Sequence, residues 1–331
     1  MGRRPNLFII GAAKCGTTSI YAWLRGHPQI YMSPRKEPRF FAPDLLSGPA
    51  GKNLRYPEDL ERYLALFAGA TDEPRVGEAS PRYIYSRQAP RLIHDFEPEA
   101  FIVALVRNPV DMMVSLHAHH VAGGTEPITD FGRALEAESE RRTGATAAPG
   151  RRLRATSNPR LTLYRERARF GAQLQEWFSV FGPERVHVIV FEEMVANPSA
   201  VFRQLLGFLR VDPDYQPPAF AAYNPRHRAR STRLRGALMS RSGQYVLWRL
   251  LPALAGERGT RALLRPFRGL NRRPAERAGP SPALRRRLQL ELADDVALLS
   301  ELVGRDLAAL WWPAQPVRAD ERLAPSSEAA R

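Results

Sequence analysis

Short apolar runs alternate with amphipathic segments along much of the chain. Residues 6–11 and 186–191 are mainly aliphatic and aromatic, and residues 100–106 are so without interruption, which is typical of strands buried on both faces. Residues 30–32 and 75–79 predict two further short strands.

The segments between these runs have the spacing of helices. One helix follows the first strand as far as His27 and Pro28, and residues 57–68 predict an amphipathic helix with a proline at its start. The other predicted helices are 110–122, 163–181, 198–210 and 283–312. Strands that alternate with helices predict an α/β fold with a central parallel sheet flanked by helices, in which ligands sit beyond the carboxyl ends of the strands.

Composition narrows the class of protein. The chain has 331 residues, 44% of them hydrophobic, which is enough for one large domain. We expect this domain to span residues 1–312, with a loop at 136–160 and a disordered tail at 313–331. Cys15 is the single cysteine, so a disulfide scaffold is excluded.

The chain also carries little that would direct it to a membrane. It contains no run of about 18 apolar residues, and the apolar run near its start is too short for a signal peptide. The expected location is therefore the cytoplasm.

A net charge of +15 comes almost entirely from arginine, because the chain contains only three lysines. These are Lys14, Lys36 and Lys52, and the first two lie in segments that other features single out.

The turn after the first strand has the composition of an anion-binding loop. Residues 11–19 read GAAKCGTTS and lead into a helix, whose first backbone N–H groups have no partner within the helix. Glycines let the backbone approach an anion, Lys14 adds a charge, and Thr17, Thr18 and Ser19 add hydroxyl donors. The turn therefore predicts a phosphate or sulfate site.

This turn does not match the loop of nucleoside-triphosphate enzymes. There the lysine follows the second glycine and precedes Ser or Thr, whereas here Lys14 precedes Gly16. Glu192 is the best substitute for a metal-binding acid, and we interpret it as a cap of the next element. A nucleotide-dependent kinase with a degenerate loop remains the alternative enzyme.

A second candidate anion site follows the strand at 100–106. Arg107 comes directly after this strand, and Ser115 lies eight residues further along the predicted helix. A guanidinium fork and a hydroxyl suit a terminal phosphate.

Taken together, these segments resemble the sulfotransferase family. FIIGAAKCGTTSIYAWLRGHPQI is similar to its 5′-phosphosulfate loop, and LVRNPVDMMVSL is similar to its 3′-phosphate signature. KEPRFF and GEASPRYIY resemble segments of bacterial members and of the heparan-sulfate branch. The resemblance covers about residues 6–312 and implies a P-loop-like fold. It also implies 3′-phosphoadenosine 5′-phosphosulfate (PAPS) as co-substrate and no metal.

The family's residue roles carry over by position. The residues implied to bind PAPS are Lys14, Cys15, Gly16, Thr17, Thr18, Ser19, Arg107, Ser115, Arg230 and Ser231. Those implied to be catalytic are Glu37 as the base, Lys14 at the leaving phosphate and Lys36 at the sulfo group. The neighbouring cations of Glu37 should keep it ionised, whereas burial by Phe40 and Phe41 would oppose this.

Two further sets of residues compete for roles at this site. His117, His119 and His120 are rival bases, which we expect to be peripheral. Glu78 is a candidate to orient the acceptor or to support the base. Ala79 follows it where the heparan-sulfate branch often has lysine, which indicates a different acceptor.

The segment 224–287 contains 17 arginines and two glutamates. We expect residues 224–282 to form a basic lid and substrate region, with Arg230 and Ser231 closing over the 3′-phosphate. The same charge suits a polyanionic acceptor or an anionic membrane surface. A non-enzymatic nucleic-acid-binding protein is a third possibility, which the lack of a recognisable RNA- or DNA-binding signature disfavours.

The sequence thus predicts a sulfotransferase that moves a sulfuryl group from PAPS to a hydroxyl. A carbohydrate, a glycolipid and a secondary metabolite are all open as acceptors. We expect no nucleic-acid partner.

Overall fold

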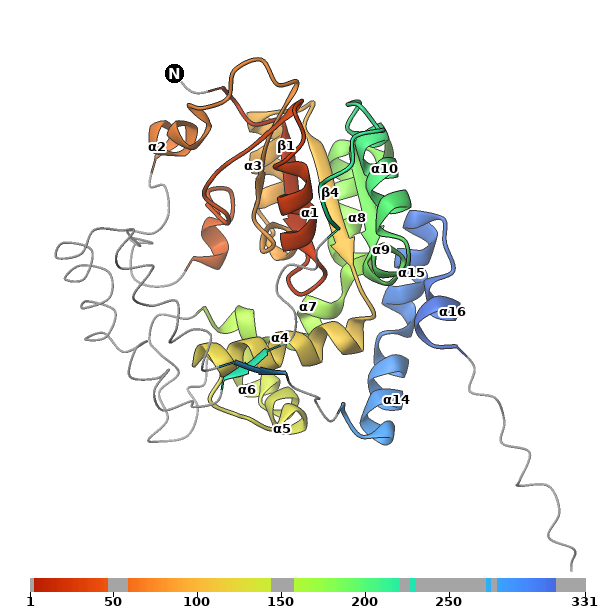
Figure 1. Ribbon diagram of the computed structural model, residues 1–331. Coiled ribbons are helices and arrows are strands. Elements are labelled where there is room, and N and C mark those ends of the chain that lie inside the picture. Colours follow the sequence, from red (N-terminus) through yellow and green to blue (C-terminus); the bar gives the residue numbers. More distant parts are fainter. Residues whose placement is uncertain are drawn as a thin grey trace, which may run out of the picture.

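A parallel five-stranded sheet forms the centre of the protein (Figure 1). The computed structural model describes residues 3–46, 59–143, 158–220, 227–229, 272–274 and 279–313. The strands are β1 (Leu7–Gly11), β2 (Ile30–Met32), β3 (Arg75–Ala79), β4 (Phe101–Val106) and β5 (Val186–Val190). They are ordered β2-β3-β1-β4-β5, and every pair is parallel. This confirms the predicted α/β fold and all five predicted strands.

The hydrophobic pattern explains which strands are central. Every residue of β1 and β4 is buried, as expected for continuous apolar runs covered on both faces. The edge strands β2 and β5 each carry one half-buried residue, Tyr31 and His187.

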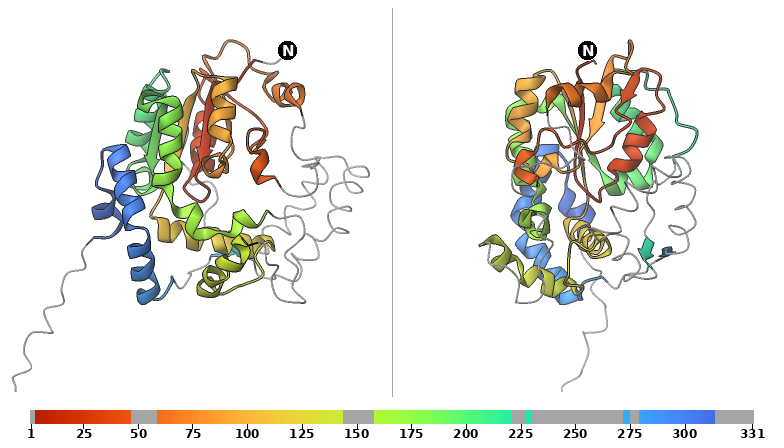
Figure 2. Two further views of the ribbon diagram at one scale, coloured as in Figure 1. Left: turned by 180° about the vertical axis from the view of Figure 1, so that it is seen from behind. Right: turned by 90° about the vertical axis from the view of Figure 1, so that its left-hand side faces the viewer.

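Helices cover both faces of the sheet (Figure 2). Helices α1 (Thr17–Leu24) and α10 (Pro198–Phe208) lie on one face, and α3 (Ala89–Phe96) and α8 (Phe170–Phe181) lie on the other. The remaining helices of the described chain are α2 (Leu60–Leu64), α4 (Pro109–Gly123), α5 (Phe131–Glu136), α6 (Glu138–Arg142), α7 (Tyr164–Ala168), α9 (Phe191–Ala196), α14 (Pro282–Glu291), α15 (Ala293–Val303) and α16 (Leu307–Trp311).

The C-terminal helix α15 is hydrogen-bonded to the start of α8. The carboxylate of Asp295 in α15 accepts the N–H groups of Gly171 and Ala172 at 2.9 and 3.0 Å, which satisfies the start of α8. A Cβ on Gly171 would lie 2.3 Å from the Asp295 carbonyl oxygen, so only glycine allows this close packing.

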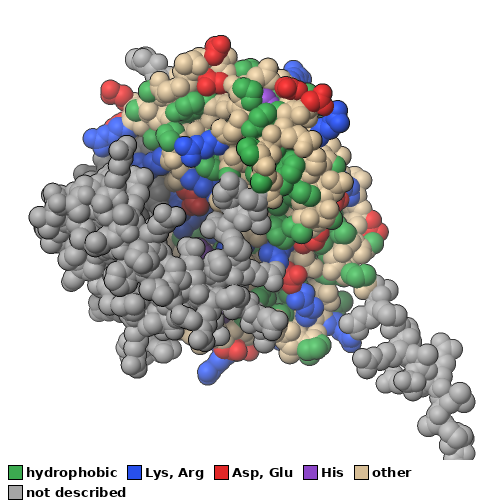
Figure 3. All heavy atoms as spheres, in the orientation of Figure 1, with side chains coloured by type: hydrophobic (Ala, Val, Ile, Leu, Met, Phe, Trp, Pro, Cys, Tyr) green, Lys and Arg blue, Asp and Glu red, His purple; other side chains and the backbone are tan. Residues whose placement is uncertain are grey.

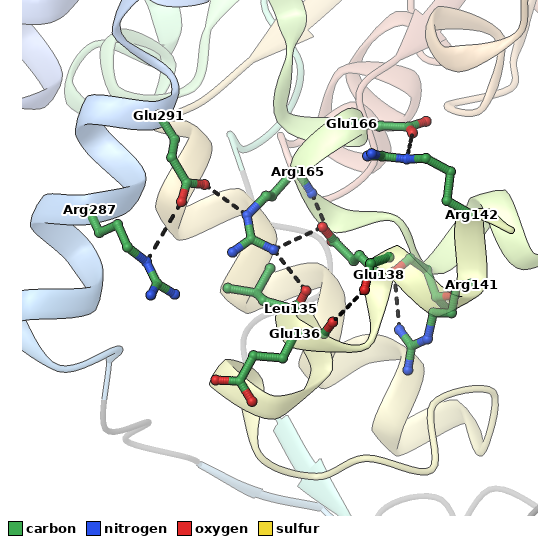
Figure 4. A network of polar contacts seen from close by, with 11 residues as sticks. Leu135, Glu136, Glu138, Arg141, Arg142, Arg165, Glu166, Arg287 and Glu291 are labelled. Carbon is green, nitrogen blue, oxygen red and sulfur yellow. Dashed lines mark hydrogen bonds and ion pairs between the residues drawn. The ribbon is translucent and has the colours of Figure 1, made fainter. Parts of the chain in front are cut away.

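Helices α4 to α7 and α14 lie beyond the carboxyl ends of the strands and are joined by ion pairs (Figure 4). Arg165 of α7 bridges Glu138 of α6 and Glu291 of α14, at 3.0 and 2.8 Å. Arg142 pairs with Glu166 at 3.1 Å. These pairs connect segments that are far apart in the sequence.

Several predicted helix boundaries were wrong. The helix predicted at 163–181 breaks at Arg169 into α7 and α8, and the one at 283–312 breaks into α14, α15 and α16. The segment 136–160, predicted as a loop, contains α6 and a 3-10 turn at Pro159–Thr162. Helix α2 is shorter than predicted, because a 3-10 turn at Ala65–Phe67 follows it.

The arginine-rich segment is described only in part. Two short strands, β6 (His227–Ala229) and β7 (Arg272–Pro274), pair antiparallel there. Arg230, Ser231, most of the proposed lid and residues 314–331 lie outside the described residues.

The described surface is mixed in charge. On the face drawn in Figure 3, Lys and Arg side chains are interspersed with Asp and Glu. Among the described residues, no helix is long and apolar enough to cross a bilayer.

A polar cluster is buried at the end of β3. Glu78 is fully buried, and its carboxylate accepts hydrogen bonds from the hydroxyls of Tyr83 at 2.6 Å, Ser80 at 2.7 Å and Tyr63 at 3.3 Å. Burial raises the pKa of Glu78 to about 7, against the effect of these three donors. At pH values between about 4.5 and 7, Glu78 therefore takes up a proton when the chain folds.

We predict that Glu78→Gln removes part of the pH dependence of stability. A carboxyl whose pKa is raised by folding stabilises the fold at low pH, and this contribution is lost as pH rises through about 4.5 to 7. Relative to wild type, the variant should gain about 3 kcal/mol of unfolding free energy across that range. Urea denaturation at several pH values measures this difference. The exposed carboxyl variant Glu61→Gln is the control, and a pH-independent offset for Glu78→Gln would contradict the assignment.

Candidate functional site

The turns after β1, β3 and β4 meet at one edge of the sheet, because these three strands are neighbours. The first turn runs from Ala12 to Gly16 and leads into α1. Gly16 caps α1 with φ at 96°, and a Cβ there would lie 2.4 Å from the Met194 side chain. The left-handed φ favours glycine here, whereas the Met194 methyl could shift to make room. The turn therefore presents the free N–H groups at the start of α1 beyond the strands, as predicted for an anion site.

The side chains of this turn and of the first residues of α1 differ in their burial. Thr17 and Ser19 are buried, whereas Lys14 and Thr18 are half-buried. Cys15 is fully buried, and burial raises the pKa of its thiol far above the ordinary value despite Arg107 nearby. The Cys15 side chain is thus an uncharged packing group, and only its backbone is available to a ligand.

Arg107 leaves β4 and lies directly against the turn. Its side chain is buried, its Nη1 donates to the Lys14 carbonyl oxygen at 3.4 Å, and its Cζ is 4.6 Å from the centroid of the Phe191 ring. The Nε atom is buried without a hydrogen-bond partner. The structure therefore brings the two predicted anion sites together. Ser115 lies on α4 and is half-buried.

Glu192 holds the Arg107 turn in place. Its carboxylate accepts the Asn108 N–H at 3.1 Å and the Trp311 Nε1–H at 2.9 Å. Asn108 in turn caps α4 and donates from Nδ2 to the Trp311 carbonyl oxygen at 3.0 Å. The sequence did not reveal this connection to the C-terminal helices, because its members are 84 to 203 residues apart.

The segment after β2 brings Lys36 and Glu37 to the same edge. Lys36 Nζ donates to the Thr18 hydroxyl, and the Glu37 N–H donates to the Ala79 carbonyl oxygen at 2.9 Å. Glu37 forms an ion pair with Arg39, whose Nε also donates to Glu37 at 3.1 Å. Lys36 and Glu37 are thus linked to the α1 and β3 sides of the site, respectively.

Backbone strain is concentrated in these two segments. Lys14, Glu37 and Arg39 have φ values of 71°, 60° and 58°, in the left-handed region that side chains rarely adopt. Such strain is retained at functional sites, where the surrounding contacts enforce it.

The charges of the two segments affect one another. Burial alone would raise the pKa of Glu37, but Arg39, Arg82 and Lys36 together lower it below its ordinary value. The pKa of Lys36 is lowered by burial, against the effect of Glu37. Glu37 is therefore ionised at neutral pH, as predicted from its cationic neighbours.

Glu78 is connected to Glu37 through Ser80. The Ser80 hydroxyl donates to Glu78 at 2.7 Å and accepts the Arg39 N–H at 3.0 Å. Because the Glu78 carboxylate is fully buried, this arrangement favours support of the base over contact with an acceptor.

The three histidines differ in their surroundings. His117 is buried and its Nε2 lies 2.8 Å from the Ile128 carbonyl oxygen, while His119 is exposed. Burial, and then Arg167, lower the pKa of His120 to about 2. The Arg82 charge contributes to the lowered pKa of both His120 and Glu37.

Sequence reasoning missed Arg167. It is a buried residue of α7 whose charge acts on Cys15 in the first turn. Nothing in the sequence separates it from the other arginines of RERAR. Among the described residues, no group of three or more His, Cys, Asp or Glu has the arrangement of a metal site.

Comparison with known proteins identifies the family. The family model described as "Sulfotransferase family" matches residues 5–216. The crystal structure of a sulfotransferase from Alicyclobacillus acidocaldarius is 32% identical in sequence, with a TM-score of 0.66. The match covers 93% of this chain and 98% of that one.

Curated relatives match over shorter parts of their length. Mouse carbohydrate sulfotransferase 15 is 25% identical over 252 residues, which cover 63% of this chain and 44% of that protein. Human heparan sulfate glucosamine 3-O-sulfotransferase 6 is 33% identical over 119 residues, or 35% of this chain and 31% of that protein. The chain thus spans less than half of these relatives. The family model matches all five strands of the central sheet and the turns after β1 and β4, so the chain belongs to the sulfotransferase family.

Proposed function

We propose that the protein transfers a sulfuryl group from PAPS to a hydroxyl group of an acceptor, without a metal. The observation that carries this proposal is the junction of the two anion sites, where Arg107 contacts the backbone of Lys14. A family member with both sites side by side is suited to a nucleotide that carries two separate phosphate groups.

In this proposal the turn of residues 12–16 binds the 5′-phosphosulfate through its backbone N–H groups and the Lys14 side chain. Free N–H groups and an ammonium stabilise the charge that develops on the leaving phosphate. Thr17, Thr18 and Ser19, at the start of α1, belong to the same 5′-phosphosulfate site. Arg107 and Ser115 bind the 3′-phosphate. The unpartnered Nε of Arg107 supports this role, because a buried N–H donor without a hydrogen-bond partner is costly. Arg230 and Ser231 remain proposed closing residues.

Glu37 is the proposed base. The acceptor oxygen forms a bond to sulfur while the bond from sulfur to the 5′-phosphate oxygen breaks. The hydroxyl proton passes to Glu37, and adenosine 3′,5′-bisphosphate (PAP) leaves. For Lys36 we propose contact with the sulfo group or the bridging oxygen of the donor, and its hydrogen bond to the Thr18 hydroxyl supports this position. The link through Ser80 and Arg39 supports a fixed orientation of Glu37.

For the acceptor we propose a carbohydrate or another hydroxyl compound. Two of the curated relatives bear the names of carbohydrate and heparan sulfate sulfotransferases, which favours a sugar. We further propose that the enzyme works in the cytoplasm.

We predict that Lys14→Ala and Arg107→Ala each weaken PAP binding by about 10- to 100-fold, since each removes charge-assisted hydrogen bonds to a phosphate. Isothermal titration calorimetry measures the affinity. Arg91→Ala, which removes an exposed arginine paired with Glu176, is the matched control and should bind PAP normally. Unchanged affinity in both site variants would refute the assignment.

We predict that Glu37→Gln lowers turnover by about 100- to 10,000-fold, as the loss of a general base does, while PAP still binds. The readout is PAP release with an accepted hydroxyl compound. Because the pKa of Glu37 is lowered, wild-type turnover should persist down to its ordinary range near pH 4.5. A loss of activity at a much higher pH, around 6.5, would contradict Glu37 as the base.

We predict that PAP release continues in EDTA. Phosphoryl transfer by kinases depends on Mg²⁺, whereas the proposed transfer relies on Lys14 and the backbone. Activity that requires added Mg²⁺, with ATP as the donor, would favour the kinase alternative.

A further inference from the structure

Arg167 of α7 is a buried cation that lacks a counter-ion in the described part of the chain. It is 6% exposed, and its Cζ lies 5.2 Å from the centroid of the Tyr85 ring. Its Nε atom is buried and makes no hydrogen bond. Burying an unpaired charge opposes folding, so its presence calls for an explanation.

Three arginines of α6 and α7 form ion pairs with acids. The pairs are Arg141 with Glu126, Arg142 with Glu166, and Arg165 with Glu138 and Glu291, the last two sets being drawn in Figure 4. The second oxygen of Glu166 accepts the Tyr85 hydroxyl at 2.9 Å. These glutamates therefore all have partners other than Arg167. This includes Glu166, which directly precedes Arg167 in the sequence.

Arg167 lies on α7, which packs against α4, the helix that follows the Arg107 turn. The His120 ring of α4 lies 6.0 Å from the ring of Tyr164, at the start of α7, and its Nδ1 is also buried without a partner. Burial lowers the pKa of His120 and, in line with this packing, the Arg167 charge lowers it further. Two buried polar groups without hydrogen bonds thus lie on two packed helices beyond the carboxyl ends of the strands.

We propose that Arg167, with His120 beside it, binds an oxyanion distinct from the two phosphates of the nucleotide. This inference rests on the proposed function, and the oxyanion is either the sulfo group of PAPS or a sulfate or carboxylate on the acceptor. The planar guanidinium offers a fork that matches such a group, and the neutral imidazole offers one more donor. Binding would neutralise the buried charge that the protein itself leaves uncompensated.

The test is a calorimetric titration of inorganic sulfate into protein saturated with PAP. PAP occupies both phosphate sites, so sulfate reports on the additional one. Wild type should bind sulfate, and Arg167→Gln should weaken that binding by about 10-fold or more. Arg169→Gln changes an exposed arginine two residues away and should bind as wild type does. Absence of sulfate binding in wild type, or equal affinity in Arg167→Gln, would overturn the proposal.

Thermal melting separates a binding residue from a structural one. Arg167→Gln removes an uncompensated cation and should melt at or above the wild-type temperature. Arg141→Gln breaks the buried pair with Glu126 and should melt lower. An equally large fall for Arg167→Gln would make Arg167 structural and would also overturn the proposal.

The source of the oxyanion follows from repeating the titration with PAPS in place of PAP. Loss of sulfate binding identifies the site as that of the transferred sulfo group, and retained binding identifies it with an acidic group of the acceptor. Failure of wild type to bind PAP would count against the proposed function. Sulfate titrated into the nucleotide-free protein and its Arg167→Gln variant would still test Arg167.

Discussion

The site depends on the placement of positive groups at one edge of a parallel sheet with few acids facing them. The start of α1, Lys14 and Arg107 lie at this edge, and Arg167 lies on α7 beyond it. The Nε atoms of both arginines are buried without hydrogen bonds. Desolvated cations of this kind oppose folding unless an anion binds. The sheet and the ion-paired helices beyond it must therefore supply enough stability to hold the site ready for its ligand.

A second constraint is the position of Glu37 at this same edge. The chain of contacts from Glu78 through Ser80 and Arg39 connects the buried end of β3 to the Glu37 carboxylate. Each contact orients the next, and the left-handed backbone at Glu37 and Arg39 is enforced by its hydrogen bonds to Ala79 and Ser80. The buried cluster thus links core stability to the geometry of Glu37, the proposed base. Arg39 keeps the Glu37 carboxylate ionised although burial disfavours its charge.

The sequence predicted the sheet well because β1 and β4 are continuous apolar runs and β2 and β5 are mainly apolar. It also placed the β1 turn and Arg107, since each follows such a run directly. It did not predict the breaks at Arg169, Leu292 and Gly304, because apolar spacing continues across them and only tertiary packing decides where the helices end. Arg167 and the Asn108–Glu192–Trp311 contacts were also missed, since they join residues distant in sequence whose types are common throughout the chain. Arg230 and Ser231 stay predictions from the family resemblance.

The central claim is that the two anion-binding turns hold the two ends of one nucleotide. A crystal structure of the complex with PAP tests it most directly. The account predicts the 5′-phosphate against the N–H groups of residues 12–17 and Lys14, with the 3′-phosphate on the Arg107 guanidinium. A nucleotide bound elsewhere, or with only one of its phosphates at this edge of the sheet, would contradict the account.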